Sequence, residues 1–313
     1  LSTGLANISY GLTYNSPLPY RLRYTTIFSF LHNSSISFSV LYIISILSVL
    51  LFAAGIAQAQ TAKSLFWRSD SLQVSEIVSE TGDQYRKVGH HGPAVENSHM
   101  ALRIYFNDSG AIDVYSKSGR GMELERYLWY PSAKMQEAAG AGSDGYIVGS
   151  TVGLGGIALW DDGKEVKLVA TKGRTARVGD TKKGSYAEMI AYGVEYKGEL
   201  VDISIRIDMS AKSREAVITA KELSGKKVRF LTGVNYHEGQ KVTSGENYIS
   251  VWGPHPAKDA TMPLGAGMRF SAKEFPVLEK TDDMVRIISL PKSEVSTKVV
   301  SASTKEAELN SAK

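Results

Sequence analysis

Cysteine is absent from the 313 residues, which excludes disulfide bonds and thiolate metal sites. The chain also lacks a large excess of one charge, because 36 Lys and Arg residues are balanced by 32 Asp and Glu residues. This balance gives no support for a general polyanion-binding surface, although it leaves room for one local basic pocket. Without disulfides the fold has to rely on a hydrophobic core, which a chain of this length can bury.

Several motifs are missing as well. No G-x-S-x-G sequence occurs, which argues against a serine-nucleophile hydrolase. The glycine-rich residues 149–156 have no Gly-Lys-Ser/Thr ending and no βαβ pattern around them, which argues against a nucleotide site. We interpret them as a tight strand connection that other backbone approaches closely. No fixed-period repeat or linker divides the chain after residue 59.

The longest apolar run spans residues 37–56 and is followed by Ala57-Gln58-Ala59, a cleavage pattern of the A-x-A type. It predicts a secretory signal peptide cleaved after Ala59, and therefore a secreted or periplasmic protein. We expect residues 1–59 to be an upstream extension plus signal peptide, and residues 60–313 to be one domain. The alternative is an uncleaved anchor, because about 20 apolar residues can cross a bilayer. A membrane would then be contacted only through this segment.

Short alternating segments predict the fold. Residues 101–106 and 111–115 flank an Asn-Asp-Ser-Gly turn, and residues 192–196 and 200–209 flank a Lys-Gly-Glu turn, so both pairs predict hairpins. About a dozen such strands predict an all-β protein, an antiparallel two-sheet sandwich of the jelly-roll or mutarotase-like supersandwich type. The main helical candidate is the short segment 122–130, and we expect residues 299–313 to fray.

Residues 88–100 hold three of the six histidines, together with a carboxylate and an amide, in a Gly- and Pro-interrupted segment before a predicted strand. Loops on a rigid β scaffold often carry binding and catalytic groups. A zinc site made of His91, His237 and Glu96 is conceivable, but none of the usual zinc-ligand spacings is present. We therefore expect no metal and no cofactor, and the balanced charge predicts no nucleic-acid partner.

Residues 88–117, 148–160, 233–237 and 252–253 together resemble a secreted family of unknown function from the polysaccharide-utilisation loci of Bacteroidetes. That family includes an ulvan oligosaccharide dehydratase. The resemblance, over residues 65–305, implies an enzyme that eliminates water, or a sugar, from a uronate at the non-reducing end of an acidic oligosaccharide. Compared with the family the chain stops early, so that we expect a C-terminal truncation.

Such an elimination needs a base for the weakly acidic C5 proton, an acid for the leaving oxygen and cations or donors for the substrate carboxylate. The predicted catalytic residues are His91, Tyr115 and His237. Arg103 and Asn97 are predicted to bind the carboxylate. The other predicted substrate-binding residues are Glu96, Tyr105, Lys117 and His90.

Two other functions stay open, namely a non-catalytic carbohydrate-binding sandwich and a mutarotase-like sugar epimerase. Catalysis predicts that His91 and His237 converge in a deep pocket, whereas a binding module predicts a shallow aromatic platform with scattered histidines. The polar faces of residues 101–115 fit either a cleft or a solvated sheet exterior.

Overall fold

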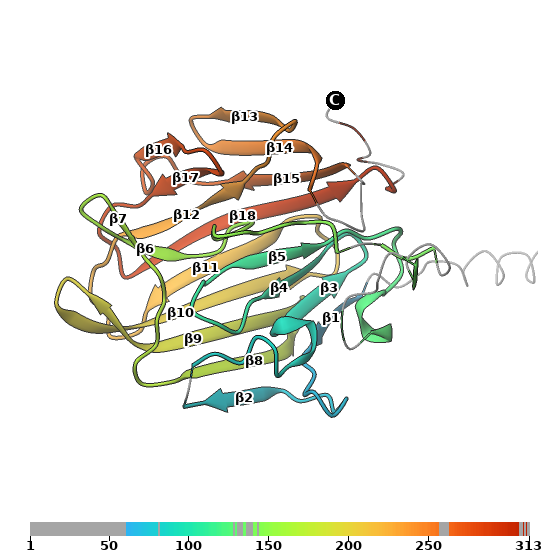
Figure 1. The fold of residues 1–313 in the computed structure, drawn as a ribbon, viewed down its shortest axis with the longest axis horizontal. Helices are drawn as coiled ribbons and strands as arrows, with labels where there is room; N and C mark the ends of the chain where they lie inside the picture. The colour runs from blue at the N-terminus through green and yellow to red at the C-terminus, as the bar shows by residue number, and fades with distance from the viewer. Residues whose placement is uncertain are drawn as a thin grey trace, which may run out of the picture. The chain divides into compact units, whose positions relative to one another are not determined.

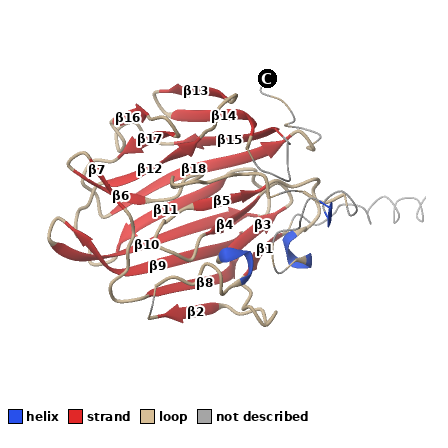
Figure 2. Cartoon of the chain, in the orientation of Figure 1, coloured by secondary structure: helices blue, strands red, loops and turns tan. Residues whose placement is uncertain are grey.

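The computed structural model describes residues 61–313 except residues 81, 128, 130–133, 136–139, 143, 257–262, 307, 308, 310, 312 and 313. The predicted signal segment lies outside the described residues. Residues Ala59–Lys313 cluster into one compact unit. Strands dominate this unit and its helical turns are short (Figure 2).

One layer of the unit is a nine-stranded antiparallel sheet with the order β13-β14-β15-β18-β11-β10-β9-β8-β2 (Figure 1). Its strands are β2 (Glu76–Ser79), β8 (Arg174–Thr181), β9 (Gly184–Tyr196), β10 (Glu199–Ser210), β11 (Ala216–Glu222), β13 (Lys241–Gly245), β14 (Tyr248–Pro254), β15 (Pro263–Arg269) and β18 (Glu294–Ser303).

The second layer consists of two smaller sheets, which have the orders β1-β3-β4-β5 and β16-β17-β12-β6-β7. Gly153 pairs with Ile112 and Leu154 pairs with Val234, so residues 153–154 join the two sheets. The strands are β1 (Ala62–Leu65), β3 (Ala94–Asn97), β4 (Ala101–Ile104), β5 (Ile112–Tyr115), β6 (Ala158–Asp161), β7 (Lys164–Val166), β12 (Phe230–Asn235), β16 (Val277–Lys280), β17 (Met284–Ile288).

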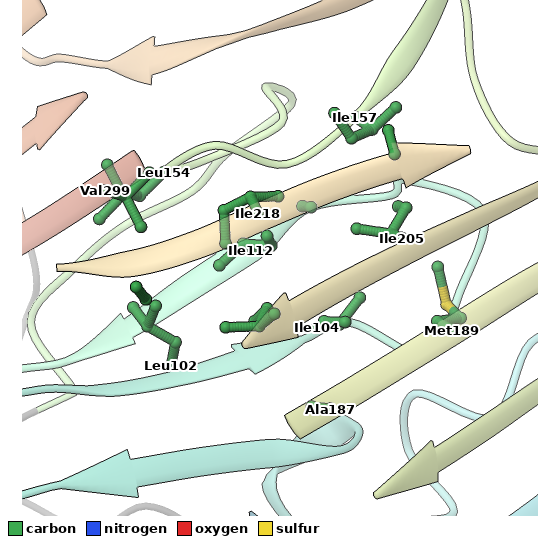
Figure 3. Close-up of a cluster of buried hydrophobic side chains, with 14 of the residues drawn as sticks. Leu102, Ile104, Ile112, Leu154, Ile157, Ala187, Met189, Ile205, Ile218 and Val299 are labelled. Carbon is green, nitrogen blue, oxygen red and sulfur yellow. The ribbon is translucent and has the colours of Figure 1, made fainter. Parts of the chain in front are cut away.

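The core lies between the layers. Ile203, Ile205 and Ile207 alternate with more exposed residues along β10, so one face of the nine-stranded sheet is apolar. In Figure 3 the apolar side chains of this sheet lie among those of the second layer, such as Leu102 and Ile112. Burial of so much apolar surface stabilises the unit without disulfides. The prediction of an all-β antiparallel sandwich is confirmed.

Both predicted hairpins are confirmed. β4 pairs with β5, and β9 pairs with β10 around Lys197 and Gly198, which both have positive φ as a two-residue hairpin turn requires. The interpretation of residues 149–156 is confirmed as well. A Cβ on Gly153 would overlap the carbonyl oxygen of Ile112, so only glycine lets these two backbones approach.

Two local predictions are wrong. The segment predicted as a helix over 122–130 forms only a 3₁₀ turn at Leu124–Arg126 among its described residues. Backbone N–H groups at the start of this segment form hydrogen bonds with the buried side chain of Glu96 instead of with other backbone groups, so no regular helix forms. The segment expected to fray from Val299 is paired through Ser303, because the strand β18 lies between β11 and β15.

Candidate functional site

The four-stranded sheet has a polar face that turns away from the nine-stranded sheet. Arg103 is opposite Asp113 in the register of β4 and β5, and Ala101 is opposite both Tyr115 and Glu96. These side chains are buried, because residues following β5 fold back over them. The face is therefore neither a solvated exterior nor an open cleft, and its two halves carry different networks.

In one half, buried polar groups hold the segment that follows β5. Glu96 forms an ion pair with Lys117 and accepts hydrogen bonds from the backbone of Glu123 and Leu124 at 2.7 and 2.9 Å. Tyr115 is fully buried and donates to the Glu123 carboxylate at 2.9 Å. Each of these polar groups has partners inside the protein, which is what burial requires.

Asn97 is also buried, at the end of β3. Its amide nitrogen donates to the carbonyl oxygens of Ser210 and Ser213, both at 2.8 Å, and its amide oxygen accepts from the backbone of His99 and Met100. Asn97 thus joins the four-stranded sheet to the β10–β11 connection. We infer structural roles for Glu96, Asn97, Tyr115 and Lys117.

The other half of the face is built around Arg103. Its Nε donates to Asp113 at 2.7 Å, and its Nη1 donates to the carbonyl oxygen of His90 at 3.2 Å. Tyr105 donates its hydroxyl proton to the same Asp113 oxygen at 2.9 Å. Burial and the neighbouring Asp113 charge raise the pKa of Tyr105, so this hydroxyl stays protonated. His90 itself is buried, and burial and the Arg103 charge lower its pKa to about 3.

His91 lies beside this group and is half-buried. Its ring stacks on Tyr85 with centroids 4.0 Å apart, and the Tyr85 ring meets Tyr105 edge-on at 4.9 Å. Trp129, which is 38% exposed, lies 5.0 Å from His91 on centroids. Nδ1 of His91 is 2.7 Å from the carbonyl oxygen of Tyr85. A carbonyl only accepts, so Nδ1 carries the proton and Nε2 keeps a lone pair. Burial lowers the pKa of His91, which favours the neutral ring.

Residues 144–147 form a strip that starts at Arg103. Asp144 is exposed, and its Oδ1 lies 3.4 Å from Nη2 of Arg103. Although the Asp144 side chain is 42% exposed, its protein-facing side is shielded from water, and this desolvation raises the pKa of Asp144 to about 6 against the lowering effect of Arg103. Two residues on, the Tyr146 side chain is 2% exposed, and its hydroxyl has no hydrogen-bond partner among the described residues. Burial raises the pKa of Tyr146 as well.

The strip ends at two histidines. The backbone nitrogen of Ile147 donates to Nδ1 of His255 at 3.1 Å, and its carbonyl oxygen lies 2.8 Å from Nε2 of His237. Asn235 donates to the same oxygen at 2.7 Å. The two imidazole rings meet edge-on at 4.9 Å, and His255 lies 4.7 Å from the Tyr146 ring. Burial and His237 lower the pKa of His255 to about 3.

These contacts assign the protons of the two rings. His237 Nε2 lies 2.8 Å from the Ile147 carbonyl oxygen and 3.3 Å from the Asn235 amide nitrogen; because the nearer carbonyl can only accept, we assign the proton to Nε2 and a lone pair to Nδ1. His255 Nδ1 accepts from an amide, so the neutral ring carries its proton on Nε2. The pair therefore combines one ring with a free acceptor and one ring with a free donor, as general acid–base chemistry requires.

The group of side chains around Arg103 and the His237–His255 pair both contact the strip at residues 144–147. Arg103 contacts Asp144 and both histidines contact Ile147, and three residue steps span at most about 10 Å. The structure thus brings Arg103, Tyr105 and His237 to one region, with His91 connected through Tyr85 and Tyr105. The convergence of His91 and His237 in one pocket stays a prediction.

Sequence reasoning missed several members of this group, namely Tyr85, Asp113, Trp129, Asp144, Tyr146 and His255. His255 had a usable signal, because it lies between Pro254 and Pro256 in a loop after a strand. Asp113 had a signal as well, because it lies two residues before Tyr115 and strand alternation puts both side chains on one face. Asp144 and Tyr146 carried no signal, because only folding places their segment over β4 and β5.

Within the described residues, no group of three His, Asp or Glu side chains is arranged to hold a metal ion, so the conceivable set of His91, His237 and Glu96 is not assembled. Over the same residues no helix is long and apolar enough to span a membrane.

Comparison with known proteins identifies the family. The chain belongs to the family described as a domain of unknown function (DUF4861). The match covers residues 54–313, which includes both groups of side chains described above. No protein of curated function gives a significant match.

Among solved structures, the chain is similar to a 4-alpha-glucanotransferase from Thermococcus litoralis, with 9% identity and a TM-score of 0.32. The alignment covers 68% of this chain and 39% of that protein. The chain therefore spans about two fifths of the length of that enzyme, and this weak likeness carries no functional argument.

Proposed function

We propose that this member of the DUF4861 family is a secreted carbohydrate-active lyase that eliminates water from a uronate at the non-reducing end of an acidic oligosaccharide. The observation that carries the proposal is the strip at residues 144–147, which includes the buried Tyr146 hydroxyl and contacts a buried arginine and two imidazoles of complementary protonation. The resemblance of its sequence blocks to a family with an ulvan oligosaccharide dehydratase supplies the substrate class.

The reaction is a β-elimination. A base removes the proton at C5, the electron pair of that C–H bond becomes the C4–C5 double bond, and the C4–O bond breaks. An acid protonates the departing oxygen, so the products are water and a 4,5-unsaturated uronate. A free hydroxyl at C4 exists only at the non-reducing end of a 4-linked chain, which makes the action exo.

His91 is the proposed base. Its neutral ring keeps a lone pair on Nε2, because Nδ1 donates to the Tyr85 carbonyl, and stacking on Tyr85 fixes the ring plane. A neutral imidazole with a free lone pair suits the removal of a weakly acidic proton. His237 also keeps a lone pair, on Nδ1, and is the substitute for this role.

Tyr146 replaces Tyr115 as the proposed acid. Its buried hydroxyl has no partner among the described residues, and a phenol held protonated by burial can donate to a leaving oxygen. Tyr115, in contrast, already donates to Glu123 in the interior. The Nε2–H of His255 is a second donor near Tyr146 and suits the binding of the leaving hydroxyl.

Arg103 is the proposed carboxylate-binding residue, and the Asp144 carboxylate indicates where a substrate carboxylate would bind. An exposed carboxylate of the protein itself lies 3.4 Å from a buried guanidinium there, so the carboxylate of a substrate can take the same position. Asp113 and the His90 carbonyl keep Arg103 oriented from behind. Tyr105 completes this group as a positioning residue through its bond to Asp113.

The direct test is the incubation of the purified protein with uronate-terminated oligosaccharides, followed by ultraviolet absorbance of the conjugated product. We expect turnover, and we expect His91→Gln to lower kcat by roughly 10²–10⁴-fold, the usual share of a general base. Glu125→Gln, a change on the exposed surface, is the control and should leave kcat unchanged. Full activity of the His91 variant would reject His91 as the base.

A mutarotase-like epimerase would use the same histidines without releasing an unsaturated product. Faster interconversion of the α and β anomers of a free sugar, or exchange of the C5 proton in deuterium oxide, with no absorbance change, would favour that function. Binding without either conversion would favour a carbohydrate-binding module.

A further inference from the structure

A second feature lies on the opposite layer, on the outer face of the nine-stranded sheet. Residues 248, 250 and 252 of β14 point outward, because Ile249 and Val251 between them are buried in the core. The neighbouring strands β13, β15 and β18 continue this face, and Figure 1 shows the four strands side by side. Their register arranges the outward side chains in three rows across the strands.

The two outer rows each hold one aromatic ring. One row contains Lys241, Trp252, Gly265 and Ala302, which are register partners in that order. The other contains Gly245, Tyr248, Arg269 and Lys298. Trp252 and Tyr248 are four residues apart, so their α-carbons are separated by about 13 Å.

Each aromatic ring lies close to a glycine of a neighbouring strand. A Cβ on Gly265 would come within 2.5 Å of the Trp252 ring, and a Cβ on Gly245 would overlap the Tyr248 ring. Each ring therefore lies against the backbone of a neighbouring strand at a place that a larger residue would fill, and Tyr248 is 40% exposed. A flat aromatic face is the surface on which the C–H side of a sugar ring packs, with burial of apolar area as the driving force.

The row between the aromatics is built from small side chains and forms the floor of a groove. Thr243, Ser250, Gly267 and Val300 are register partners here. A cavity of about 230 Å³ lies over this floor against Trp252, with Leu309 at its rim. The cavity itself is lined by Trp252 and not by Tyr248, and the separation of about 13 Å between the two aromatic α-carbons exceeds the length of one sugar ring.

Cations surround the groove. Lys241 is exposed beside Trp252, and the side chains of Arg269 and Lys298 are 70% and 50% exposed beside Tyr248. Both of the latter contact one carboxylate, Glu215, at 3.3 and 3.1 Å, so among the ion pairs of the described residues one carboxylate serves these three cations and positive charge is in excess. The chain as a whole is close to neutral, which makes this excess local and suited to an anionic ligand.

We propose that this groove is a second carbohydrate-binding site that holds an internal stretch of a polyuronate chain. Sugar rings pack on Trp252 and Tyr248, and the uronate carboxylates pair with Lys241, Arg269 and Lys298. The site does no chemistry and uses none of the residues of the strip at 144–147. It keeps the protein on a polymer whose ends the catalytic site would process.

The test is affinity electrophoresis of the protein in native gels that contain alginate, a polyuronate, or hydroxyethylcellulose, a neutral polymer. We expect retardation by alginate and about tenfold weaker apparent affinity for Trp252→Ala and for Tyr248→Ala, equivalent to about 1.4 kcal/mol. Tyr186→Ala is the matched control, because Tyr186 is on the same outer face but under Arg206, away from the groove. It should bind alginate as the unchanged protein does.

Circular dichroism and thermal melting establish that the variants are folded. His91→Gln should retain full retardation, so failure of the proposed reaction does not affect this test. Equal binding of Trp252→Ala and the unchanged protein would overturn the site, as would the absence of retardation in alginate. Equal retardation by hydroxyethylcellulose would overturn the polyuronate as its ligand.

Discussion

At the scale of single residues, the candidate site depends on a buried ion pair. Arg103 and Asp113 have side chains that are 3% and 0% exposed, and each uses several hydrogen bonds to offset the loss of water. Such a pair adds little net stability compared with an apolar pair, but removal of one partner leaves an uncompensated charge. The ion pair therefore positions the Arg103 side chain, and loss of either partner alone destabilises the fold.

We expect Asp113→Asn to lower the free energy of unfolding by about 3–5 kcal/mol, because it leaves the buried guanidinium without its counter-charge. Asp144→Asn removes an exposed partner of the same guanidinium and should change stability by less than about 1 kcal/mol. Urea denaturation of both variants measures the difference. Similar losses would show that Asp144 and Asp113 share the role of counter-ion.

Tyr146 and Tyr115 are both buried, and their Phe variants test which hydroxyl is the proposed acid and which is structural. Tyr146→Phe removes a hydroxyl with no partner among the described residues, so we expect unchanged or increased stability and a loss of turnover of roughly 10²-fold or more. Tyr115→Phe removes a bond to Glu123 and should cost about 1 kcal/mol or more of stability, with kcat unchanged. The opposite result, active Tyr146→Phe and inactive but stable Tyr115→Phe, would restore Tyr115 as the acid.

At the scale of elements, the second layer depends on the connection at residues 149–156. Residues 153–154 pair with β5 on one side and β12 on the other, so they unite two sheets that no regular strand joins. The same connection leads out of the strip at 144–147. The positions of the His237–His255 pair and of Arg103 are therefore coupled through one stretch of backbone.

Gly153 and Gly149 test this connection as a matched pair. Both have positive φ, 70° and 63°, so alanine is strained at either position by about 1–2 kcal/mol. Only at Gly153 would the added Cβ overlap other backbone, that of Ile112, whereas Gly149 has open space. We expect Gly153→Ala to be destabilised clearly more than Gly149→Ala in thermal melts. Equal melting temperatures would mean that the close backbone approach at Gly153 does not contribute to stability.

At the scale of the whole molecule, buried neutral histidines link stability to pH. His90 and His255 both have a pKa of about 3 in the folded protein, against an ordinary value of 6.5. Between these values the unfolded chain binds more protons than the folded one, so stability is complete above pH 6.5 and falls as the pH drops toward 3. Asp144 acts in the opposite direction, because its raised pKa makes the folded protein bind a proton below about pH 6.

His90→Asn isolates one of these contributions. Asparagine tolerates the positive φ of 53° at this position and cannot be protonated. We expect the slope of unfolding free energy against pH to be smaller in the variant by about 1.4 kcal/mol per pH unit between pH 6 and 4. Chemical denaturation at several pH values measures both slopes. Parallel curves would show that His90 keeps an ordinary pKa.

The sequence by itself determined the class of fold and much of its layout. Period-two alternation and turn residues are local signals, and they correctly predicted the β4–β5 and β9–β10 hairpins and the close backbone approach at residues 149–156. The same alternation puts Arg103 and Tyr105 on one face of their strand and Asp113 and Tyr115 on one face of the next, because side-chain direction along a strand follows from residue number. That Arg103 lies opposite Asp113 follows only from the register of β4 and β5.

Only the tertiary structure decided which polar residues are structural and which border the site. Tyr115 looks like Tyr146 in sequence, but burial beside Glu123 commits the Tyr115 hydroxyl to an internal hydrogen bond, whereas the Tyr146 hydroxyl has no partner among the described residues. Segment 144–147 lies far along the chain from both Arg103 and His255, and its contacts come from packing of separate elements. No local pattern encodes such contacts, because a residue's partners across a sandwich depend on the register of every strand between them.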